Sequence, residues 1–447
     1  MRKLLYLAYN FPPVSTGGAS RNLVLARYLP VGGWEMVPFT ASNHIGLPMD
    51  PTLPDHLPEG MKVNSSFHLD PLHLLASAGR AAAVRPEGKT PRRVSFKTRL
   101  KRFLCHYLIL PDRAVTWALT AVPAATRTAR REKTGIVMSF GPQHSVHLIS
   151  LAVARLCGLP FVSHFGDLWA YDSLVDWKAL PAFTVRVNKW LERFVVLHSD
   201  GIVTTTPLSS QYFRTVYGIR CPPTIDIPNG YDPRRIKGMN SVPEERDRNG
   251  SVLRICYTGF FIGQQTPEPF LKGLGLFRER NADARILFKM VGSFGEDYDG
   301  LPRALGVEDL VEIVGQVPFS QVITHQRDAD VLMVCLPPLP GSEVKMPSKL
   351  AEYLLWNKPL LAVAPEGDLT RTVRELSAGY CCAPIPGDVC ATLERIFSDF
   401  TSGRLKVDLD SDEVADRFDM SILCVELGRF LDSIADGGGQ PIPSVPG

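Results

Sequence analysis

The sequence predicts an α/β protein built from two doubly wound domains. Short apolar runs alternate with longer amphipathic segments over most of the 447 residues, a pattern typical of parallel strands covered by helices on both faces. Residues 233–251 interrupt this alternation with charged residues, Gly and Pro and hardly any apolar side chain. Because such a stretch between two periodic regions is typical of an interdomain connection, two domains are expected.

The first domain is assigned to residues 1–232. Strands are expected where short apolar runs are bounded by turn-forming residues, and helices where apolar residues recur at helical spacing. The expected strands are residues 3–9, 34–39, 136–139, 160–164, 201–205 and 224–227. The expected helices include residues 19–28, 144–157, 183–198 and 208–217.

The second domain is assigned to residues 252–410, after a linker over 233–251. Its expected strands are residues 253–258, 286–291, 311–314, 331–336 and 359–364, and its helices include 268–280, 348–356 and 369–377. A C-terminal amphipathic helix is expected over 411–436, because apolar residues recur there at helical spacing. The tail 437–447 opens with three glycines and holds three prolines, so it is expected to be disordered.

Composition and charge exclude several classes of protein. Lys and Arg number 49 against 46 Asp and Glu, a net charge of +3, which argues against a protein that coats nucleic acid over its whole surface. The nine cysteines show no C-x-x-C spacing and indicate reduced thiols in a cytoplasmic protein. The apolar run near the N-terminus is too short for a secretory signal, and no run approaches the roughly 18 residues of a membrane span.

Loops that follow strands are the expected place for a site, because the carboxyl ends of parallel strands meet at one edge of a sheet. The loop after the first strand contains Gly17 and Gly18 and opens a helix. Glycines let a ligand approach the backbone, and a helix N-terminus offers free amides to a phosphate or a sugar hydroxyl. The segment is neither a G-x-G-x-x-G nor a Walker loop, and an ordinary strand-to-helix turn is an equal explanation.

Residues 164–169 (HFGDLW) follow the strand expected at 160–164. In a cleft, Asp167 would hold sugar hydroxyls or act as a base, and His164 would donate to a developing charge. The structural alternative makes Asp167 a helix cap and His164 a hydrogen-bonded core residue.

Residues 341–353 (GSEVKMPSKLAEY) follow the strand expected at 331–336. A proline with serine behind it suits a helix start, so the amides near Ser348 and Lys349 would hold an anion and Lys345 or Lys349 would add positive charge. Glu352 lies one turn further on, where it would accept hydrogen bonds from a ribose diol. The alternative is an ordinary capped helix with solvated lysines.

Five segments resemble landmarks of one known family and occur in its order: residues 139–145 (SFGPQHS), 159–169 (LPFVSHFGDLW), 227–232 (IPNGYD), 257–259 (YTG) and 347–353 (PSKLAEY). The family is the GT-B fold glycosyltransferases, specifically glycosyltransferase family 4 and its bacterial cell-surface polysaccharide members. The resemblance extends from about Leu4 to about Ile396.

The resemblance implies a transferase that moves a sugar from a nucleotide-diphosphate sugar, held by the second domain, to a glycan or lipid-linked acceptor held by the first. Transfer would retain the anomeric configuration without a metal or a further cofactor, and positive charge would stabilise the leaving diphosphate. The candidate catalytic residues are Asp167, His164 and Glu343. The candidate nucleotide-sugar ligands are Gly259, Gly292, Gln316, Val317, Lys345, Ser348, Lys349 and Glu352, with Gly17 and Gly18 in the acceptor or phosphate loop.

The chain departs from the family pattern at three places. The family has two glutamates separated by seven residues, but Val344 occupies the first position and Glu343 lies one residue early. Residues 260–265 lack the arginine that often follows the first strand of the second domain, and Gly166 stands where relatives have another arginine. These departures leave open a scaffold that binds nucleotide or glycan without catalysis. A GT-B epimerase is a third hypothesis, with Asp167 and Glu343 as its paired carboxylates.

Residues 80–133 form a basic stretch with fourteen basic and three acidic residues, a net +11. Apolar residues recur within it at roughly helical spacing, a combination typical of a surface that lies on anionic lipid. The alternative is a solvated insertion whose apolar face packs on its own domain. No nucleic-acid partner is expected, because aromatic residues are few and no RNA-binding module surrounds the stretch. We therefore expect a cytoplasmic protein, peripheral on the inner face of the plasma membrane.

Overall fold

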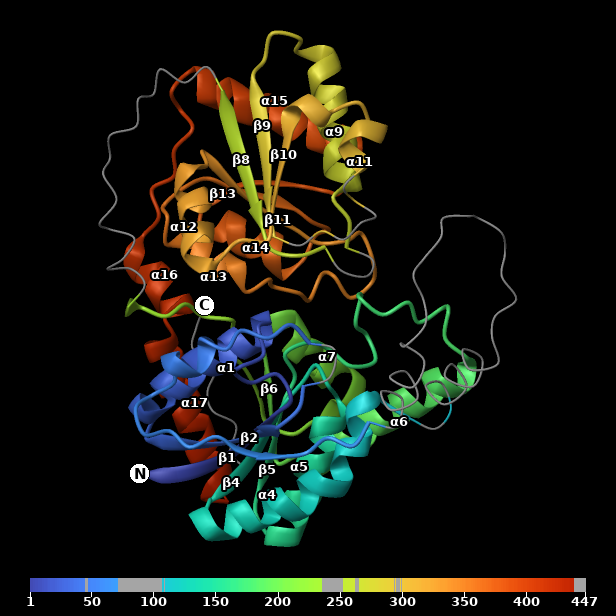
Figure 1. Cartoon of the computed structure of the whole chain (residues 1–447), viewed down its shortest axis with the longest axis vertical. Helices are drawn as coiled ribbons and strands as arrows, with labels where there is room; N and C mark the ends of the chain where they lie inside the picture. Colours follow the sequence, from blue (N-terminus) through green and yellow to red (C-terminus); the bar gives the residue numbers. More distant parts are fainter. Residues whose placement is uncertain are drawn as a thin grey trace.

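The computed structural model contains two parallel sheets, stacked one above the other along the long axis of the molecule (Figure 1). It describes residues 1–44, 47–70, 107, 109–234, 252–261, 265–292, 294, 298 and 300–437. Most of the predicted linker, the basic residues 80–106 and the tail 438–447 lie outside the described residues.

The first sheet has seven parallel strands in the order β3-β2-β1-β4-β5-β6-β7. They are β1 (Arg2–Ala8), β2 (Trp34–Ala41), β3 (Asn64–Ser66), β4 (Ile136–Phe140), β5 (Phe161–His164), β6 (Gly201–Thr204) and β7 (Thr224–Asp226). The helices of this half are α1 (Gly17–Tyr28), α4 (Ala118–Glu132), α5 (Ser145–Cys157), α6 (Ala182–His198) and α7 (Pro207–Tyr217). Leu4 to Leu7 are fully buried, because the central strand β1 is covered on both faces.

The second sheet has six parallel strands in the order β10-β9-β8-β11-β12-β13. They are β8 (Leu253–Thr258), β9 (Ile286–Val291), β10 (Val311–Gly315), β11 (Val331–Cys335), β12 (Leu360–Val363) and β13 (Gly379–Cys382). The helices are α9 (Glu268–Arg280), α11 (Leu301–Ala304), α12 (Phe319–Asp328), α13 (Lys349–Leu354), α14 (Asp368–Glu375) and α15 (Pro386–Thr401). The predicted fold class, two doubly wound α/β domains, is confirmed.

The C-terminal segment forms two helices, α16 (Ser411–Phe418) and α17 (Met420–Ala435), where the sequence pattern indicated one. Asp419 has extended backbone between them, and its side chain accepts a hydrogen bond from Ser421 N at 2.7 Å. An N-cap of this kind starts a new helix. Leu427 and Phe430 of α17 pack in the same core cluster as Leu4 of β1. The chain therefore returns from the second domain to cover the first sheet (Figure 1).

Both sheets reverse their strand order beside the first strand of their domain. In the first sheet the reversal lies between β1 and β4, and in the second between β8 and β11. Loops at such a switch point splay apart and leave a crevice at the carboxyl ends of the strands, where ligands bind in this architecture. The segment after β1 contains Gly17, and the segment after β11 contains residues 341–353. Residues 164–169 (HFGDLW) begin at the end of β5, which is the neighbour of β4 in the sheet.

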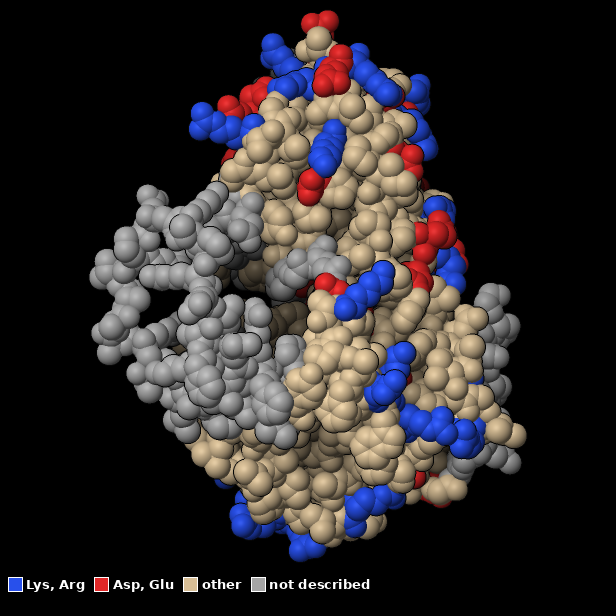
Figure 2. All heavy atoms as spheres, turned by 90° about the vertical axis from the view of Figure 1, so that its right-hand side faces the viewer, with Lys and Arg blue, Asp and Glu red and all other residues tan. Residues whose placement is uncertain are grey.

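Surface charge differs between the two halves on the side of the molecule where α6 lies. The upper half in Figure 2, which holds the second sheet, shows Lys, Arg, Asp and Glu together, whereas the lower half shows mostly Lys and Arg. No helix in the described part of the chain is both long and apolar enough to span a bilayer.

Candidate functional site

The glycine loop of the first domain, at Gly17, lies beside Ser348 of the second domain. Thr16 caps α1 by accepting a hydrogen bond from Ala19 N, so α1 begins at Gly17. A methyl group on Gly17 would lie 3.4 Å from Ser348 Oγ, and one on Gly18 would lie 3.2 Å from the ring of Phe140. Two segments that the sequence proposed as ligand contacts, about 330 positions apart, therefore meet across the interface.

Arg21, one turn into α1, donates hydrogen bonds to three consecutive residues of the segment that precedes the linker. It is 5 % exposed and donates to Ile227 O at 2.8 Å, Pro228 O at 2.7 Å and Asn229 Oδ1 at 2.8 Å. Burial lowers the pKa of the Arg21 guanidinium to about 10, so it remains a cation at neutral pH. Asn229 in turn donates to Met346 O of the second domain at 3.3 Å. Residues 227–232 are one of the segments that resemble the family, and Arg21 holds the first three of them.

His164 lies under the surface, beside the same arginine. Its Nε2 is 3.2 Å from the Arg21 Nη2 donor, so Nε2 is the acceptor and Nδ1 carries the proton. Burial, with a contribution from the charge of Arg21, lowers the pKa of His164 well below the ordinary value, so the ring is neutral at physiological pH. His164 is fully buried. It is placed to support the loop from below, and its Nδ1–H has no partner among the described residues.

Asp167 forms an ion pair across the two domains. Lys345 Nζ lies 2.8 Å from Asp167 Oδ1 and 2.8 Å from Asp172 Oδ1. Burial lowers the pKa of the Lys345 ammonium, but the charges of the two carboxylates outweigh it and raise that pKa overall. Burial and the charge of Asp167 raise the pKa of Asp172. The structure thus pairs Asp167, a predicted catalytic residue, with Lys345, which was predicted to bind the diphosphate.

Replacing Lys345 by glutamine is expected to destabilise the protein by about 2 kcal/mol, because it leaves a half-buried pair of carboxylates without a cation. Urea unfolding measures the change. Lys272→Gln is the matched control, since Lys272 forms an exposed ion pair with Glu268 at 2.7 Å and its loss is expected to cost about 0.5 kcal/mol or less. Equal losses in the two variants would contradict the role assigned to Lys345.

Val344 and Glu343, which precede Lys345, also contact the first domain. Val344 is 7 % exposed and packs in the core cluster of the first domain, although it belongs to the second. Its carbonyl oxygen accepts a hydrogen bond from Thr206 Oγ1 at 2.7 Å. Glu343 Oε2 accepts from Gly341 N at 2.8 Å and is hydrogen-bonded to Tyr171. The position where the family pattern has a glutamate is therefore an apolar contact between the domains.

Lys349 is a buried cation at the carboxyl edge of the second sheet. Its Nζ donates to Thr258 O at 2.6 Å and lies 3.7 Å from the centroid of the Tyr257 ring. Burial lowers the pKa of the ammonium to about 8. No carboxylate among the described residues forms an ion pair with it. A buried cation without a counter-charge favours binding of an anion.

Two glycines pack closely beside Lys349. Gly259 has φ +137°, and a methyl group there would lie 2.7 Å from Lys349 Nζ. Gly292 has φ +142°, and a methyl group there would lie 1.8 Å from Gly259 O. A side chain is therefore excluded at both positions, which lets the ends of β8 and β9 and the Lys349 ammonium pack closely together.

The remaining predicted ligands lie around the same edge. Gln316 is exposed on the loop after β10. Val317 is partly buried against the core cluster of the second domain that includes Leu350. Glu352 lies half-buried on α13, which begins at Lys349. The structure thus places Lys349 and Glu352 on one short helix.

Buried polar atoms without a described partner gather at the carboxyl ends of β1, β4 and β5. They include Asn10 Oδ1, Gln143 Oε1, His144 Nδ1, His147 Nε2 and His164 Nδ1. His144 stacks on Trp169 with the ring centroids 4.7 Å apart, and burial lowers its pKa to about 3. Because most buried polar groups in proteins have a partner, this group indicates a place where water or a ligand completes the hydrogen bonds. The sequence did not single out Asn10, Gln143 or His144 individually.

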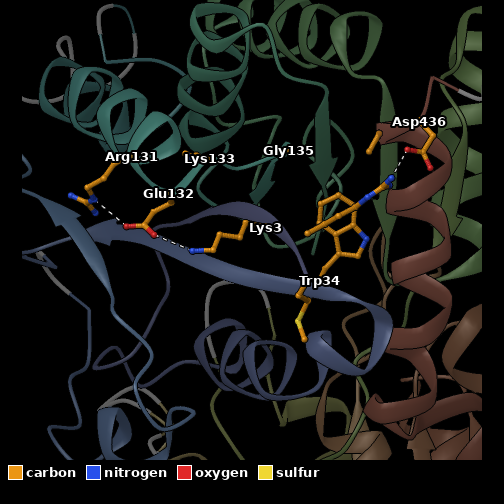
Figure 3. Close-up of a pocket in the computed structure, with 10 residues that line it drawn as sticks. Lys3, Trp34, Arg131, Glu132, Lys133, Gly135 and Asp436 are labelled. Carbon is orange, nitrogen blue, oxygen red and sulfur yellow. Dashed lines mark hydrogen bonds and ion pairs between the residues drawn. The ribbon is translucent and has the colours of Figure 1, made fainter.

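A separate hollow lies at the opposite, amino edge of the first sheet (Figure 3). Its volume is about 630 Å³. Arg2 pairs there with Asp432 and Asp436 at 3.0 and 2.6 Å. Lys3 pairs with Glu132 at 3.2 Å (Figure 3). None of the candidate site residues lines it. Because it lies at the amino ends of the strands, opposite to the end where ligands bind in this architecture, we place the site at the carboxyl edges instead.

The described residues contain no group of three or more His, Cys, Asp or Glu side chains placed to hold a metal ion. The candidate site consists of Lys349, the two glycines beside it, and the interdomain contacts of residues 343–348.

No protein-family model matches the chain, and no curated protein matches its sequence. Solved structures match it over nearly its whole length. Sucrose-phosphate synthase from Thermosynechococcus elongatus is 13% identical, with 98% of this chain and 100% of that chain covered and a TM-score of 0.64. Anabaena HepE, solved in complex with UDP and glucose, is 13% identical, with 97% and 100% covered and a TM-score of 0.62.

The lipopolysaccharide outer core galactosyltransferase WaaB, solved in its apo form, is 15% identical, with 96% of this chain and 99% of that chain covered and a TM-score of 0.57. At these identities the likeness establishes the architecture. The chain has the GT-B fold, with two Rossmann-like domains that each contain one parallel sheet.

Proposed function

We propose that the protein is a retaining, metal-independent glycosyltransferase that acts in cell-surface polysaccharide assembly. It would move a sugar from a nucleotide-diphosphate sugar to a glycan, and a lipid-linked glycan is the first acceptor to test. The observation that carries the proposal is the buried ammonium of Lys349, which has no carboxylate partner among the described residues and lies at the carboxyl edge of the second sheet. A diphosphate supplies the missing negative charge.

The nucleotide half of the donor is assigned to the second domain. Lys349 and Ser348 would meet the diphosphate, Gly259 and Gly292 would let it approach the backbone, and Glu352 would accept hydrogen bonds from the ribose. Gln316 and Val317 would lie beside the base. HepE has been solved with UDP and with UDP-glucose, so UDP is the first nucleotide to test.

Catalysis would rest on the positive charge at the leaving group. The C–O bond of the donor breaks as negative charge grows on the diphosphate, and Lys349 with the nearby amides stabilises that charge without a resident metal ion. Asp167, Glu343 and the buried His164 would border the acceptor side, where Gly17 lies beside Ser348. Activity that EDTA leaves unchanged, and a product with the anomeric configuration of the donor by NMR, are the expected results.

A thermal-shift titration with UDP followed by a transfer assay over a panel of UDP-sugars tests the proposal. Saturating ligand stabilises a protein that has a true site, by about 2.7 kcal/mol at a hundred times Kd. Stabilisation by UDP and release of UDP from one sugar donor are expected. A melting temperature that no nucleoside diphosphate raises would refute the donor site.

The affinity for UDP is expected to fall as the pH rises through about 8. The pKa of Lys349 in the free protein is about 8, so above that value the ammonium loses the proton that attracts the phosphate. The terminal phosphate keeps its charge over this range, because its own pKa is near 6. Calorimetry above and below pH ~8 should show up to a tenfold rise in Kd per pH unit and proton uptake on binding. A flat profile in the native protein would contradict the assignment to Lys349.

A second candidate, a binding scaffold without catalysis, is favoured by one observation: Val344 occupies the position of a family glutamate and is packed into the first domain. Stabilisation by UDP without turnover of any donor would support this scaffold. Release of UDP from any sugar donor in the presence of an acceptor would dismiss it.

The predicted membrane contact through residues 80–133 remains a proposal. Of these, 80–106 and 108 lie outside the described residues, while α4 forms the C-terminal part of the stretch. A cytoplasmic enzyme peripheral on the inner membrane face fits the proposed acceptor.

A further inference from the structure

Helix α6 presents an outer face of aromatic and basic side chains. Phe183, Trp190 and Phe194 are 50, 60 and 37 % exposed, and the rings of Trp190 and Phe194 stack with their centroids 5.7 Å apart. The basic residues Arg186, Lys189 and Arg193 are exposed between them. These positions recur every three or four residues and therefore lie along one side of the helix.

The charges of this face have one sign. The single acidic residue of α6, Glu192, is 2 % exposed and accepts hydrogen bonds from Ala170 N and Tyr217 on the inner side. Within the described ranges, no carboxylate forms an ion pair with Arg186, Lys189 or Arg193. The outer face therefore carries three basic side chains around three large aromatic side chains and exposes no acidic side chain of α6.

The inner face of α6 holds the loop of the candidate site. Asn188 Oδ1 accepts a hydrogen bond from Trp169 Nε1 at 2.8 Å, and Glu192 Oε2 accepts one from Ala170 N at 2.7 Å. The two donors, Trp169 and Ala170, follow Asp167 closely in the sequence. At the start of the helix, the Tyr107 ring stacks on Phe183 with a centroid distance of 5.7 Å. The same helix therefore carries the exposed aromatic and basic face on its outer side and holds the loop at Asp167 on its inner side.

We propose that this face of α6, defined by Phe183, Arg186, Lys189, Trp190, Arg193 and Phe194, docks onto a bilayer of anionic phospholipid. Tryptophan and phenylalanine suit the boundary between head groups and acyl chains, and Lys and Arg attract anionic head groups. The mostly basic half of Figure 2 lies on the side of the molecule that carries α6. This docking would set the loop at Asp167 beside the membrane, where a lipid-linked acceptor is found; only that last link rests on the proposed function.

Vesicle co-sedimentation tests the surface. The full chain is mixed at about 0.1 M salt, where long-range attraction is already screened, with vesicles of phosphatidylcholine alone and with vesicles containing an equal part of phosphatidylglycerol. The native protein is expected to sediment with the anionic vesicles. Arg186→Gln, Lys189→Gln and Arg193→Gln together should weaken binding about a hundredfold, since each basic residue near an anionic surface contributes about fivefold. Trp190→Ala with Phe194→Ala should weaken it about tenfold or more.

The matched control removes a charge and an apolar side chain from the second domain. Arg303 and Ile385 are 85 and 54 % exposed there, and Arg303→Gln with Ile385→Ala should bind the vesicles like the native protein. Native protein that binds neither vesicle overturns the proposal. So do α6 variants that bind as well as the native protein, which would assign binding to another segment. A native dimer that Trp190→Ala with Phe194→Ala converts to a monomer in size-exclusion chromatography would assign the face to a second copy instead.

Vesicle binding needs no nucleotide, so its outcome is separate from that of the UDP titration. Loss of vesicle binding with an unchanged thermal shift by UDP would support the docking surface and leave the donor site intact. A protein that binds vesicles and no nucleotide would refute the transferase while keeping the surface.

Discussion

Replacing Lys349 by methionine is expected to weaken UDP binding about a hundredfold while the protein stays folded. The Lys349 ammonium is buried, donates to Thr258 O at 2.6 Å and has no carboxylate partner in the described structure. A charge-assisted hydrogen bond to phosphate contributes about 2 to 3 kcal/mol, which corresponds to about a hundredfold in affinity. Methionine has a similar length and no charge to desolvate, so the free energy of unfolding should change by less than about 1 kcal/mol. Calorimetry and urea unfolding measure the two quantities.

Lys358→Met is the matched control. The Lys358 ammonium also donates to backbone carbonyls, among them Ala329 O at 2.6 Å, and lies 5.8 Å from the centroid of the Trp356 ring. It precedes β12 and so lies at the amino edge of the same sheet. Its removal should cost stability and leave UDP affinity unchanged. If Lys349→Met binds UDP as tightly as the native protein, the diphosphate site is elsewhere.

The fold was predictable because burial in a parallel sheet leaves a clear pattern in the sequence. The run Leu4 to Leu7 is apolar on both sides of the strand, and the predicted β8 and β9 have the observed bounds. Strand β3 was missed because its three residues, Asn64–Ser66, are polar and lie at the sheet edge. The break at Asp419 was missed because the apolar spacing continues across it. The extended backbone of Asp419 and the hydrogen bond that its side chain accepts from Ser421 N show where α17 starts.

The candidate site was predictable as a set of loops and not as a set of contacts. Topology alone sends the loops after β1 and β5 to the carboxyl edge of the first sheet and the loop after β11 to the carboxyl edge of the second. Gly17, Asp167 and Lys349 were therefore selected before any distance was known. Which groups pair depends on the angle between two domains, about which local sequence says nothing. Lys345 was expected to face diphosphate and instead contacts Asp167 and Asp172. Val344 is a departure from the family pattern that becomes intelligible as an interdomain contact.

Arg21 illustrates the same limit. It lies 143 positions from His164 and more than 200 from Ile227, and nothing in the helix pattern distinguishes it from a solvated arginine. Three of its acceptors lie on the segment before the linker, and one of these, Asn229, also contacts the second domain. A single cation thus orients the acceptor-side loop and the segment that leads into the second domain.

Arg21→Ala is accordingly expected to lower the free energy of unfolding by about 3 to 5 kcal/mol. The substitution leaves Ile227 O, Pro228 O and Asn229 Oδ1 without their donor in a buried place, and each such loss costs about 1 to 3 kcal/mol before relaxation. Urea unfolding followed by tryptophan fluorescence measures it. Arg214→Ala is the control, because Arg214 is exposed and donates one bond, to Thr224 O at 3.0 Å, so its loss should cost less than about 1 kcal/mol.

Binding distinguishes a purely structural role of Arg21 from one in domain orientation. Asn229 contacts Met346 O, two residues before Ser348, so an altered 227–232 segment should shift the second-domain loop toward which Gly17 points. Arg21→Ala that is still folded should therefore bind UDP several-fold more weakly, whereas Arg214→Ala should bind it like the native protein. A folded Arg21→Ala variant with native UDP affinity would confine this arginine to stability and separate the donor site from the segment that joins the domains.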